Sequence, residues 1–225
     1  MLSVSKDWNP KQKALNSFLS NNDEKNAVAL CLQMHSQLHD SQLTLITNSY
    51  QDMLINDLSE MCFRHMSFDS FSSIAWNLWH ITRIEDAVCN ILIADESQIF
   101  NKTLKKRMGA SLEDTGNAMD LKEADAFSKT IKMKELLNYR FNVGERSQKI
   151  IKGLSRLDFK KKPHKKQLDR LLKENVLINH KESIGLLDFW SKKTVADLLS
   201  MPITRHQIVH LNNCMKLKAK YMKNH

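Results

Sequence analysis

Glycine and proline are scarce in this chain, with five and three residues among 225. Sheet proteins of this length need many tight turns, which draw on glycine, proline and Asn-Gly pairs. The shortage therefore argues against a mainly β fold and favours long helices with few connections. No internal repeat, low-complexity tract or Pro/Ser linker divides the sequence. We expect residues 1–225 to form one all-α domain with a full core.

Paired cysteine motifs and long hydrophobic runs are also missing. The four cysteines stand apart, with no C-x-x-C pair, so the sequence offers neither a zinc ribbon nor a redox dithiol. Residues 1–10 are mostly polar, and no apolar run is long enough to cross a bilayer. We therefore predict no secretory leader, no membrane partner, and free thiols in a reducing cytoplasm.

The charge is unbalanced, with 34 basic against 25 acidic residues and a formal net charge of +9. A basic chain can bind nucleic acid or an anionic membrane. Most of these charges are dispersed, and the one dense lysine cluster, between Lys160 and Lys166, is interrupted by Pro163 and His164. Neither a ribonucleoprotein motif nor a heptad basic region accompanies it. We interpret the cluster as a solvated connecting segment and rank a nucleic-acid partner last.

Apolar residues at helical spacing predict four substantial helices. Asp23 is placed to cap the first, Ser70 or Ser72 begins the second, and Pro202 suits the first turn of the last. The second is apolar around more than half its circumference, which is typical of a central helix. The four predicted helices span residues 23–39, 70–94, 133–154 and 202–222.

Weaker patterns predict shorter helices between these four. Asn9 and Thr194 are candidate caps for two of them. The polar stretch 101–123 contains Gly109 and Gly116 and predicts a long surface excursion. The whole pattern predicts a four-helix bundle with long, partly helical crossover connections. The short helices are expected at residues 10–19, around 50–59, and at 167–174, 183–190 and 194–200.

Histidines supply the candidate chemistry. Two pairs stand four residues apart, His35/His39 and His206/His210. On a helix this spacing places two imidazoles on one face, where both can reach one metal ion. A metal needs a third ligand, and His80 lies mid-helix on a face expected to point inward. His80 is either that ligand or a hydrogen-bonded core histidine, because an unpaired buried imidazole is costly.

Two of the predicted helices resemble a known family. Residues 73–86 read SIAWNLWHITRIED, and residues 201–212 read MPITRHQIVHLN. The first resembles the second helix of the DinB/YfiT-like superfamily, an aromatic-rich helix with a single histidine. The second resembles that family's final helix with its H-x-x-x-H. The order and separation of the two motifs also fit the family, and the resemblance covers about residues 23 to 222.

The resemblance implies a DinB/YfiT-like bundle with His80, His206 and His210 as ligands of one divalent ion. Zinc, nickel, iron and cobalt all suit three imidazoles. It implies either metal-dependent hydrolysis or transfer of a low-molecular-weight thiol, with a small-molecule substrate, and it makes a homodimer plausible. The connections 95–132 and 155–193 are longer than in compact members and could cover the mouth of the site.

Several residues around His80 are candidates for supporting roles. Arg83, one turn on, could bind a substrate anion, and Asn77, one turn before, could orient an imidazole or substrate. Trp76 could wall the pocket or simply pack in the core. Asn213, one turn after His210, is a better candidate than Gln207 to support a ligand from behind.

The acidic residues near His80 do not supply a general base. Glu85 and Asp86 do not share the face of His80, so we expect them to pair with Arg83 or with a neighbouring helix. The general base stays unassigned. His35 and His39 are expected near one end of the bundle, as pocket residues or behind the ligands.

Two other functions are compatible with the same sequence. One keeps the fold without catalysis, as a stress-associated protein whose pocket binds a ligand or partner. The other makes the positive charge the function, with nucleic acid as the partner, and predicts binding that falls steeply with salt.

Overall fold

A computed structural model describes residues 4–43, 46–67 and 72–224. This described part is helical and contains no strand; its one β-type pairing is an isolated bridge between Ser67 and Ser72. The prediction of an all-α chain is confirmed. Within these residues, no helix has both the length and the hydrophobicity that a bilayer crossing requires. Ser70, one of the two predicted caps, lies outside the described residues.

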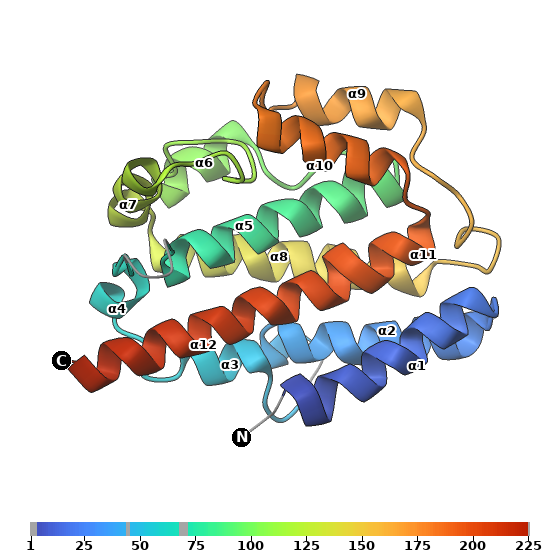
Figure 1. The fold of residues 1–225 in the computed structure, drawn as a ribbon, viewed down its shortest axis with the longest axis horizontal. Helices are drawn as coiled ribbons and strands as arrows, with labels where there is room; N and C mark the ends of the chain where they lie inside the picture. The colour runs from blue at the N-terminus through green and yellow to red at the C-terminus, as the bar shows by residue number, and fades with distance from the viewer. Residues whose placement is uncertain (1–3, 44–45, 68–71, 225) are drawn as a thin grey trace.

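The longest helical stretches lie side by side, as Figure 1 shows. Helix α5 packs on both α8 and α12, and α2 packs on the same two helices. Every residue of α5 except Trp76 is buried, which confirms the predicted central helix. These stretches are α2 (Glu24–Leu38), α5 (Ile74–Asp86) with its π-helical extension η3 (Ala87–Ile93), α8 (Met133–Lys152) and α12 (His206–Asn224).

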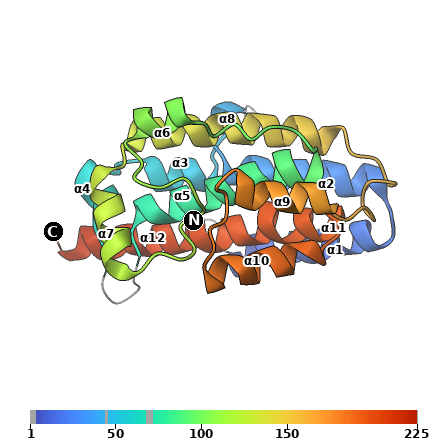
Figure 2. The same cartoon turned by 90° about the horizontal axis from the view of Figure 1, so that it is seen from above.

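The shorter elements surround these helices: α6, α7, α9 and α10 lie above α5 in Figure 1, on the side seen from above in Figure 2. Helix α1 packs against α2, η1 packs against α1, and α3 and α4 pack beside α12. They are η1 (Val4–Trp8), α1 (Asn9–Ser20), η2 (Ser41–Leu43), α3 (Tyr50–Ile55), α4 (Glu60–Arg64), α6 (Lys102–Met108), α7 (Leu121–Thr130), α9 (Lys165–Lys173) and α10 (Lys181–Ser191).

Of the four candidate caps that the structure describes, Asp23 and Thr194 are correct, and Asn9 and Ser72 are not. The side chains of Asp23 and Thr194 accept hydrogen bonds from the first turns of α2 and α11 (Val195–Leu198). Asn9 does not cap α1, because the π-helical turn η1 leads straight into the helix and Trp8 takes the cap position. The second bundle helix is capped by Ser73, whose hydroxyl accepts from the Trp76 amide.

The final helix begins earlier than predicted. Pro202 lies inside a π-helical segment, η4 (Leu199–Arg205), which joins α11 to α12 without a break. Proline leaves a carbonyl on the preceding turn without its usual donor. The Thr204 hydroxyl lies 2.9 Å from Leu199 O and 2.8 Å from Ser200 O, so it can donate to the carbonyls of this widened turn. The proline therefore stands within a helix instead of starting one.

The predicted surface excursion over 101–123 is wrong in part. It contains α6 and leads into α7, where Phe127 is fully buried. Gly109 and Gly116 have φ angles of +69° and +72°, which suit glycine, and Gly109 ends α6. Between them, residues 113–116 run along α5 and bind its side chains. The polar, glycine-containing sequence of this segment could not show that its backbone carbonyls accept hydrogen bonds from side chains of α5.

Candidate metal centre

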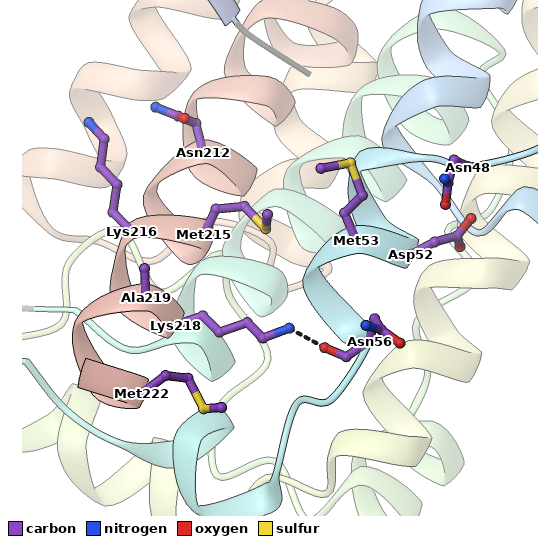
Figure 3. A pocket seen from close by; sticks show the side chains of 10 residues that line it. All are labelled: Asn48, Asp52, Met53, Asn56, Asn212, Met215, Lys216, Lys218, Ala219 and Met222. Atoms are coloured by element: carbon purple, nitrogen blue, oxygen red, sulfur yellow. Dashed lines mark hydrogen bonds between the residues drawn. The ribbon is translucent and has the colours of Figure 1, made fainter. Parts of the chain in front are cut away.

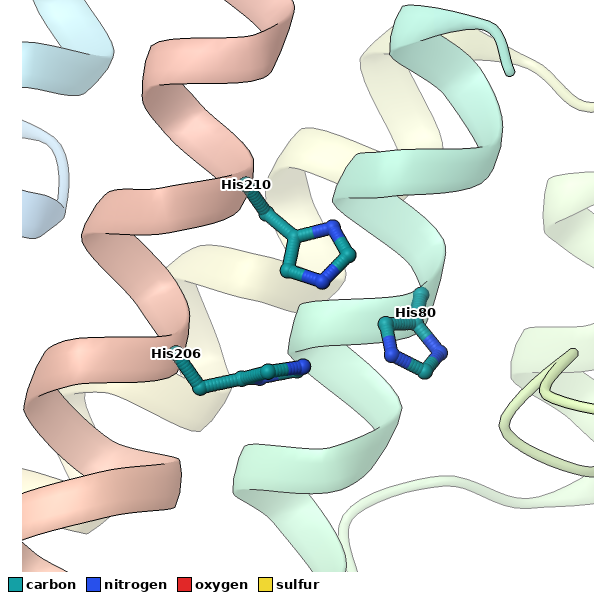
Figure 4. A group of neighbouring side chains, drawn as sticks. All are labelled: His80, His206 and His210. Atoms are coloured by element: carbon teal, nitrogen blue, oxygen red, sulfur yellow. The ribbon is translucent and has the colours of Figure 1, made fainter. Parts of the chain in front are cut away.

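The structure brings the three predicted histidines together. His80 on α5 faces His206 and His210 on α12, and the rings point toward one another in Figure 4. One ligand nitrogen from each lies within 4.8 Å of the others. The ring centroids are 5.1 Å apart for His80 and His206, 4.9 Å for His80 and His210, and 4.4 Å for the pair on α12.

A row of hydrogen bonds fixes the orientation of His80. Its Nδ1 lies 2.8 Å from the backbone oxygen of Thr115. A carbonyl can only accept, so Nδ1 carries the proton and Nε2 keeps a lone pair. The flanking carbonyls are also used: Trp76 Nε1 donates to Gly116 O at 3.2 Å and Trp79 Nε1 to Asp114 O at 2.9 Å. The 113–116 segment is thus bound to one face of α5.

Asn77 fixes His210 in the same way. Its Nδ2 donates to Ser73 O at 2.7 Å, and also to the Ser72 hydroxyl, so its oxygen faces the other way. That oxygen lies 2.7 Å from His210 Nδ1, which must donate and leaves Nε2 with a lone pair. Asn213 Nδ2 donates to the same oxygen at 3.4 Å. The predicted supporting roles of Asn77 and Asn213 are consistent with this geometry.

Trp76 forms one wall of the cluster. Its ring stacks on His80 with centroids 4.9 Å apart and an interplanar angle of 8°, and it lies 5.9 Å from His210.

His206 is held differently from the other two histidines. Its Nδ1 is a buried atom with no hydrogen-bond partner.

The three imidazoles are neutral at physiological pH. Burial lowers the pKa of His80 to about 4, against a smaller opposing effect of its bond to Thr115. Burial and the neighbouring His80 lower the pKa of His210 to about 3. His206 is lowered well below the ordinary value, first by burial and then by the other two rings. Neutral imidazoles with lone pairs that converge are the state a metal ion requires.

A second histidine cluster lies in the core, and sequence reasoning did not find it. His35 in α2 and His39 at the C-cap of this helix are fully buried. Their Nε2 atoms lie 2.7 and 3.0 Å from the two carboxylate oxygens of Glu85 on α5. The rings stack with centroids 4.3 Å apart. The spacing of the histidines was visible in the sequence, but no local pattern names a carboxylate on another helix.

Both clusters contain atoms that could hold a metal ion, but their hydrogen bonds differ. Burial opposes ionisation of Glu85, yet His39 and His35 and their hydrogen bonds outweigh it and hold its pKa well below the ordinary value. Burial lowers the pKa of His39 to about 3. An ionised carboxylate only accepts, so Nε2 donates from both rings and Nδ1 has no partner.

This contrast favours the first cluster as the metal centre. Metal-binding histidines usually donate their other ring N–H to a carbonyl or carboxylate. His80 and His210 do so through Nδ1, whereas His35 and His39 donate their N–H groups to the carboxylate of Glu85, the third member of their own cluster. In the second cluster, two histidines donate hydrogen bonds to one buried carboxylate. We call this group, which consists of His35, His39 and Glu85, the Glu85 cluster.

Arg83 does not face the histidines. Its guanidinium is fully buried, donates to Glu113 O at 2.9 Å and Tyr139 Oη at 3.0 Å, and lies 3.4 Å from Asp86 Oδ2. These contacts place the guanidinium within the core, Nη2 has no hydrogen-bond partner there, and the role of Arg83 in binding a substrate anion stays a prediction. The predicted pairing of Asp86 with Arg83 is confirmed, and Glu85 pairs with a neighbouring helix.

A groove of about 790 Å³ lies between α3 and the C-terminal half of α12. Figure 3 shows Met53, Met215 and Met222 at its walls, with Lys218 donating to the backbone oxygen of Asn56. None of the three predicted ligands lines it. It is thus separate from the candidate metal centre.

Comparison with known proteins adds no relative: no protein-family model matches the chain, and no curated protein matches it significantly. The assignment of the centre therefore rests on the geometry of the three histidines and their partners.

Proposed function

We propose that the chain is a DinB/YfiT-like metalloprotein in which His80, His206 and His210 bind one divalent ion. Helices α2, α5, α8 and α12 would form the four-helix bundle of that family, with the remaining elements in its crossovers. The observation that supports the proposal best is the pair of fixed tautomers, because Thr115 and Asn77 leave Nε2 of His80 and His210 free to bind a metal.

The donor set suits a Lewis acid with open coordination. Three neutral imidazoles bring no charge, and the group contains no carboxylate. His80, His206 and His210 would hold the ion without neutralising its charge, and a divalent ion bound by them would supply Lewis-acid chemistry toward a small-molecule substrate, water or thiol. We propose a metal-dependent enzyme that acts on a small molecule by hydrolysis or by transfer of a low-molecular-weight thiol.

The chain's own residues have defined tasks in this proposal. Asn77 and the Thr115 carbonyl hold two ligand rings at fixed angles, which lowers the entropy lost when a metal binds. Trp76 covers one side of His80 and keeps water from that face. His206 and His210 are partly exposed on α12, so substrate would approach from their side.

Metal binding is tested with purified, tag-free protein titrated with Co²⁺ and Zn²⁺. We expect one ion per chain for the wild type and at least tenfold weaker binding for His210→Ala, because two imidazoles hold an ion poorly. His164→Ala is the control, since that ring is about half exposed, and its contacts are the capping bond to α9 and a 3.3 Å contact with Asp95 Oδ2, neither of which involves the three histidines. If His210→Ala binds as the wild type does, the assignment of the centre is wrong.

The buried neutral histidines also make the metal-free protein sensitive to acid. Each takes up a proton near pH 6.5 when the chain unfolds but resists it when folded, so stability is full above pH 6.5 and falls as the pH drops toward 4. Replacing His80 with glutamine removes one such group. In urea unfolding of metal-free protein, we expect the decline to be shallower by up to about 1.4 kcal/mol per pH unit. Equal slopes for both proteins would contradict the neutral assignment.

A further inference from the structure

Gln207 links α12 to α5 beside the candidate centre. Its side chain is fully buried and directly follows His206 in the sequence. The amide nitrogen donates to Ile81 O at 3.0 Å and to Glu85 Oε2 at 2.9 Å. Ile81 is the residue after His80, so the clamp joins the two helices at the level of the ligands.

The partners of Gln207 are themselves fixed from the other two long helices. Its amide oxygen accepts from Arg140 Nη2 on α8 at 3.0 Å. Arg140 also donates to Gln51 Oε1 at 2.7 Å and to Leu38 O at 3.0 Å. The Glu85 carboxylate is held by the two histidines of α2. Both N–H groups of the Gln207 amide therefore donate, and its oxygen accepts, within a buried network.

His206 needs such support more than the other two ligands. Thr115 orients His80 and Asn77 orients His210, but Nδ1 of His206 has no partner. The ring of His206 is consequently placed by its backbone and by packing alone. The backbone of α12 at this point is fixed by the next residue, whose side chain is clamped to α5.

We infer that Gln207 is a positioning residue of the metal centre, which sets the distance between His206 and His80 through its bonds to Ile81 and to the Glu85 cluster. The inference rests on the proposed function. It assigns the Glu85 cluster and Arg140 the task of holding the amide of Gln207, without contact between any of them and the ion.

The test compares two buried glutamines that make the same kind of contact. Gln207→Met removes the clamp and keeps the side-chain length. Gln167→Met is the matched control, because Gln167 Nε2 donates to the backbone oxygens of Ile91 and Leu92 in η3, away from the ligands. The readouts are Co²⁺ affinity, the Co²⁺ absorption spectrum and the thermal midpoint of each metal-free protein.

We expect Gln207→Met to bind Co²⁺ about tenfold more weakly than the wild type and with altered ligand-field bands. Gln167→Met should lower the thermal midpoint but keep the wild-type affinity and spectrum. Should Gln207→Met fail to fold, Gln207→Asn keeps a neutral amide but is one methylene too short to reach both Ile81 O and Glu85 Oε2, and we expect the same loss of affinity.

Three results would overturn the inference. The first is a foldable Gln207 variant with wild-type affinity and spectrum. The second is an equal loss in Gln167→Met, which would show a general effect of stability. The third is a second bound ion that disappears in His35→Ala, since the Glu85 cluster would then be a metal site. If the wild type binds no ion at all, the proposed function fails first, and that outcome is distinct from these three.

Discussion

Glu85→Leu is expected to lower the free energy of unfolding by about 3–5 kcal/mol, the range typical when one partner of a buried ionic network is removed. The carboxylate is fully buried and accepts from His35, His39 and Gln207. Without it, three buried donors lose their acceptor. Arg140, whose pKa burial lowers only to about 10, stays cationic and loses the negative charge of Glu85, which opposes that lowering.

The measurement is urea unfolding of metal-free protein at pH 7, so that metal binding does not enter. Glu145→Leu is the control on α8, since Glu145 and Lys149 form an exposed pair and its loss should cost less than about 1 kcal/mol. Glu85→Gln keeps the shape and should fall between the two. A loss below about 1 kcal/mol for Glu85→Leu would show that the network does not stabilise the fold.

Helical periodicity was enough to predict the first three long helices to within a few residues, because one face of each must be buried, whereas Pro202 misplaced the start of the last. The rotation of about 100° per residue along a helix also predicted correctly that Glu85 does not share the face of His80. It could not name the partner of Glu85, because the spacing within one helix says nothing about which helix packs against it. His35 lies 50 residues away from Glu85 in the sequence.

The candidate centre was predicted from one lone histidine and one pair, placed by resemblance to a family. The structure brings these three residues together, and it adds Thr115, whose carbonyl no residue-type pattern could indicate. Sequence reasoning preferred Asn213 to Gln207 because it counted turns from His210. The amide of Gln207 makes more hydrogen bonds within the core, because Gln207 points toward α5 and α8 and not along the face of α12 that carries the histidines.

The two histidine clusters show how hydrogen bonds decide the chemistry of similar residues. Each contains an i,i+4 pair on one helix and a third residue on α5. Where the third residue is an ionised glutamate, the imidazole protons are directed at it and the charge is balanced by Arg140. Where the third residue is His80, the Nδ1 protons of His80 and His210 are directed at Thr115 O and Asn77 Oδ1, and their Nε2 lone pairs stay free. Spacing alone could not separate these cases.

Gly144→Ala should be destabilising although it lies in the middle of α8, where alanine normally gains about 1 kcal/mol over glycine. A Cβ at this position would lie 2.6 Å from His39 Nδ1 and 3.0 Å from two further ring atoms. The His39 ring cannot withdraw easily, because it is bonded to Glu85 and stacked on His35. We expect a net loss of about 1–3 kcal/mol from this overpacking.

Gly185→Ala is the matched control, because that glycine also lies within a helix, α10, and a Cβ there meets nothing within 4 Å. It should gain up to about 1 kcal/mol, so the two variants should differ by about 1–4 kcal/mol in urea unfolding. A double-mutant cycle with His39→Ala identifies the cause. If the new methyl group clashes with the His39 ring, Gly144→Ala should cost at least about 1 kcal/mol less in the His39→Ala background. This difference is within the range of coupling energies measured between residues in contact. An unchanged cost would place the strain elsewhere in α8, and the close approach of α2 to α8 would then not depend on this glycine.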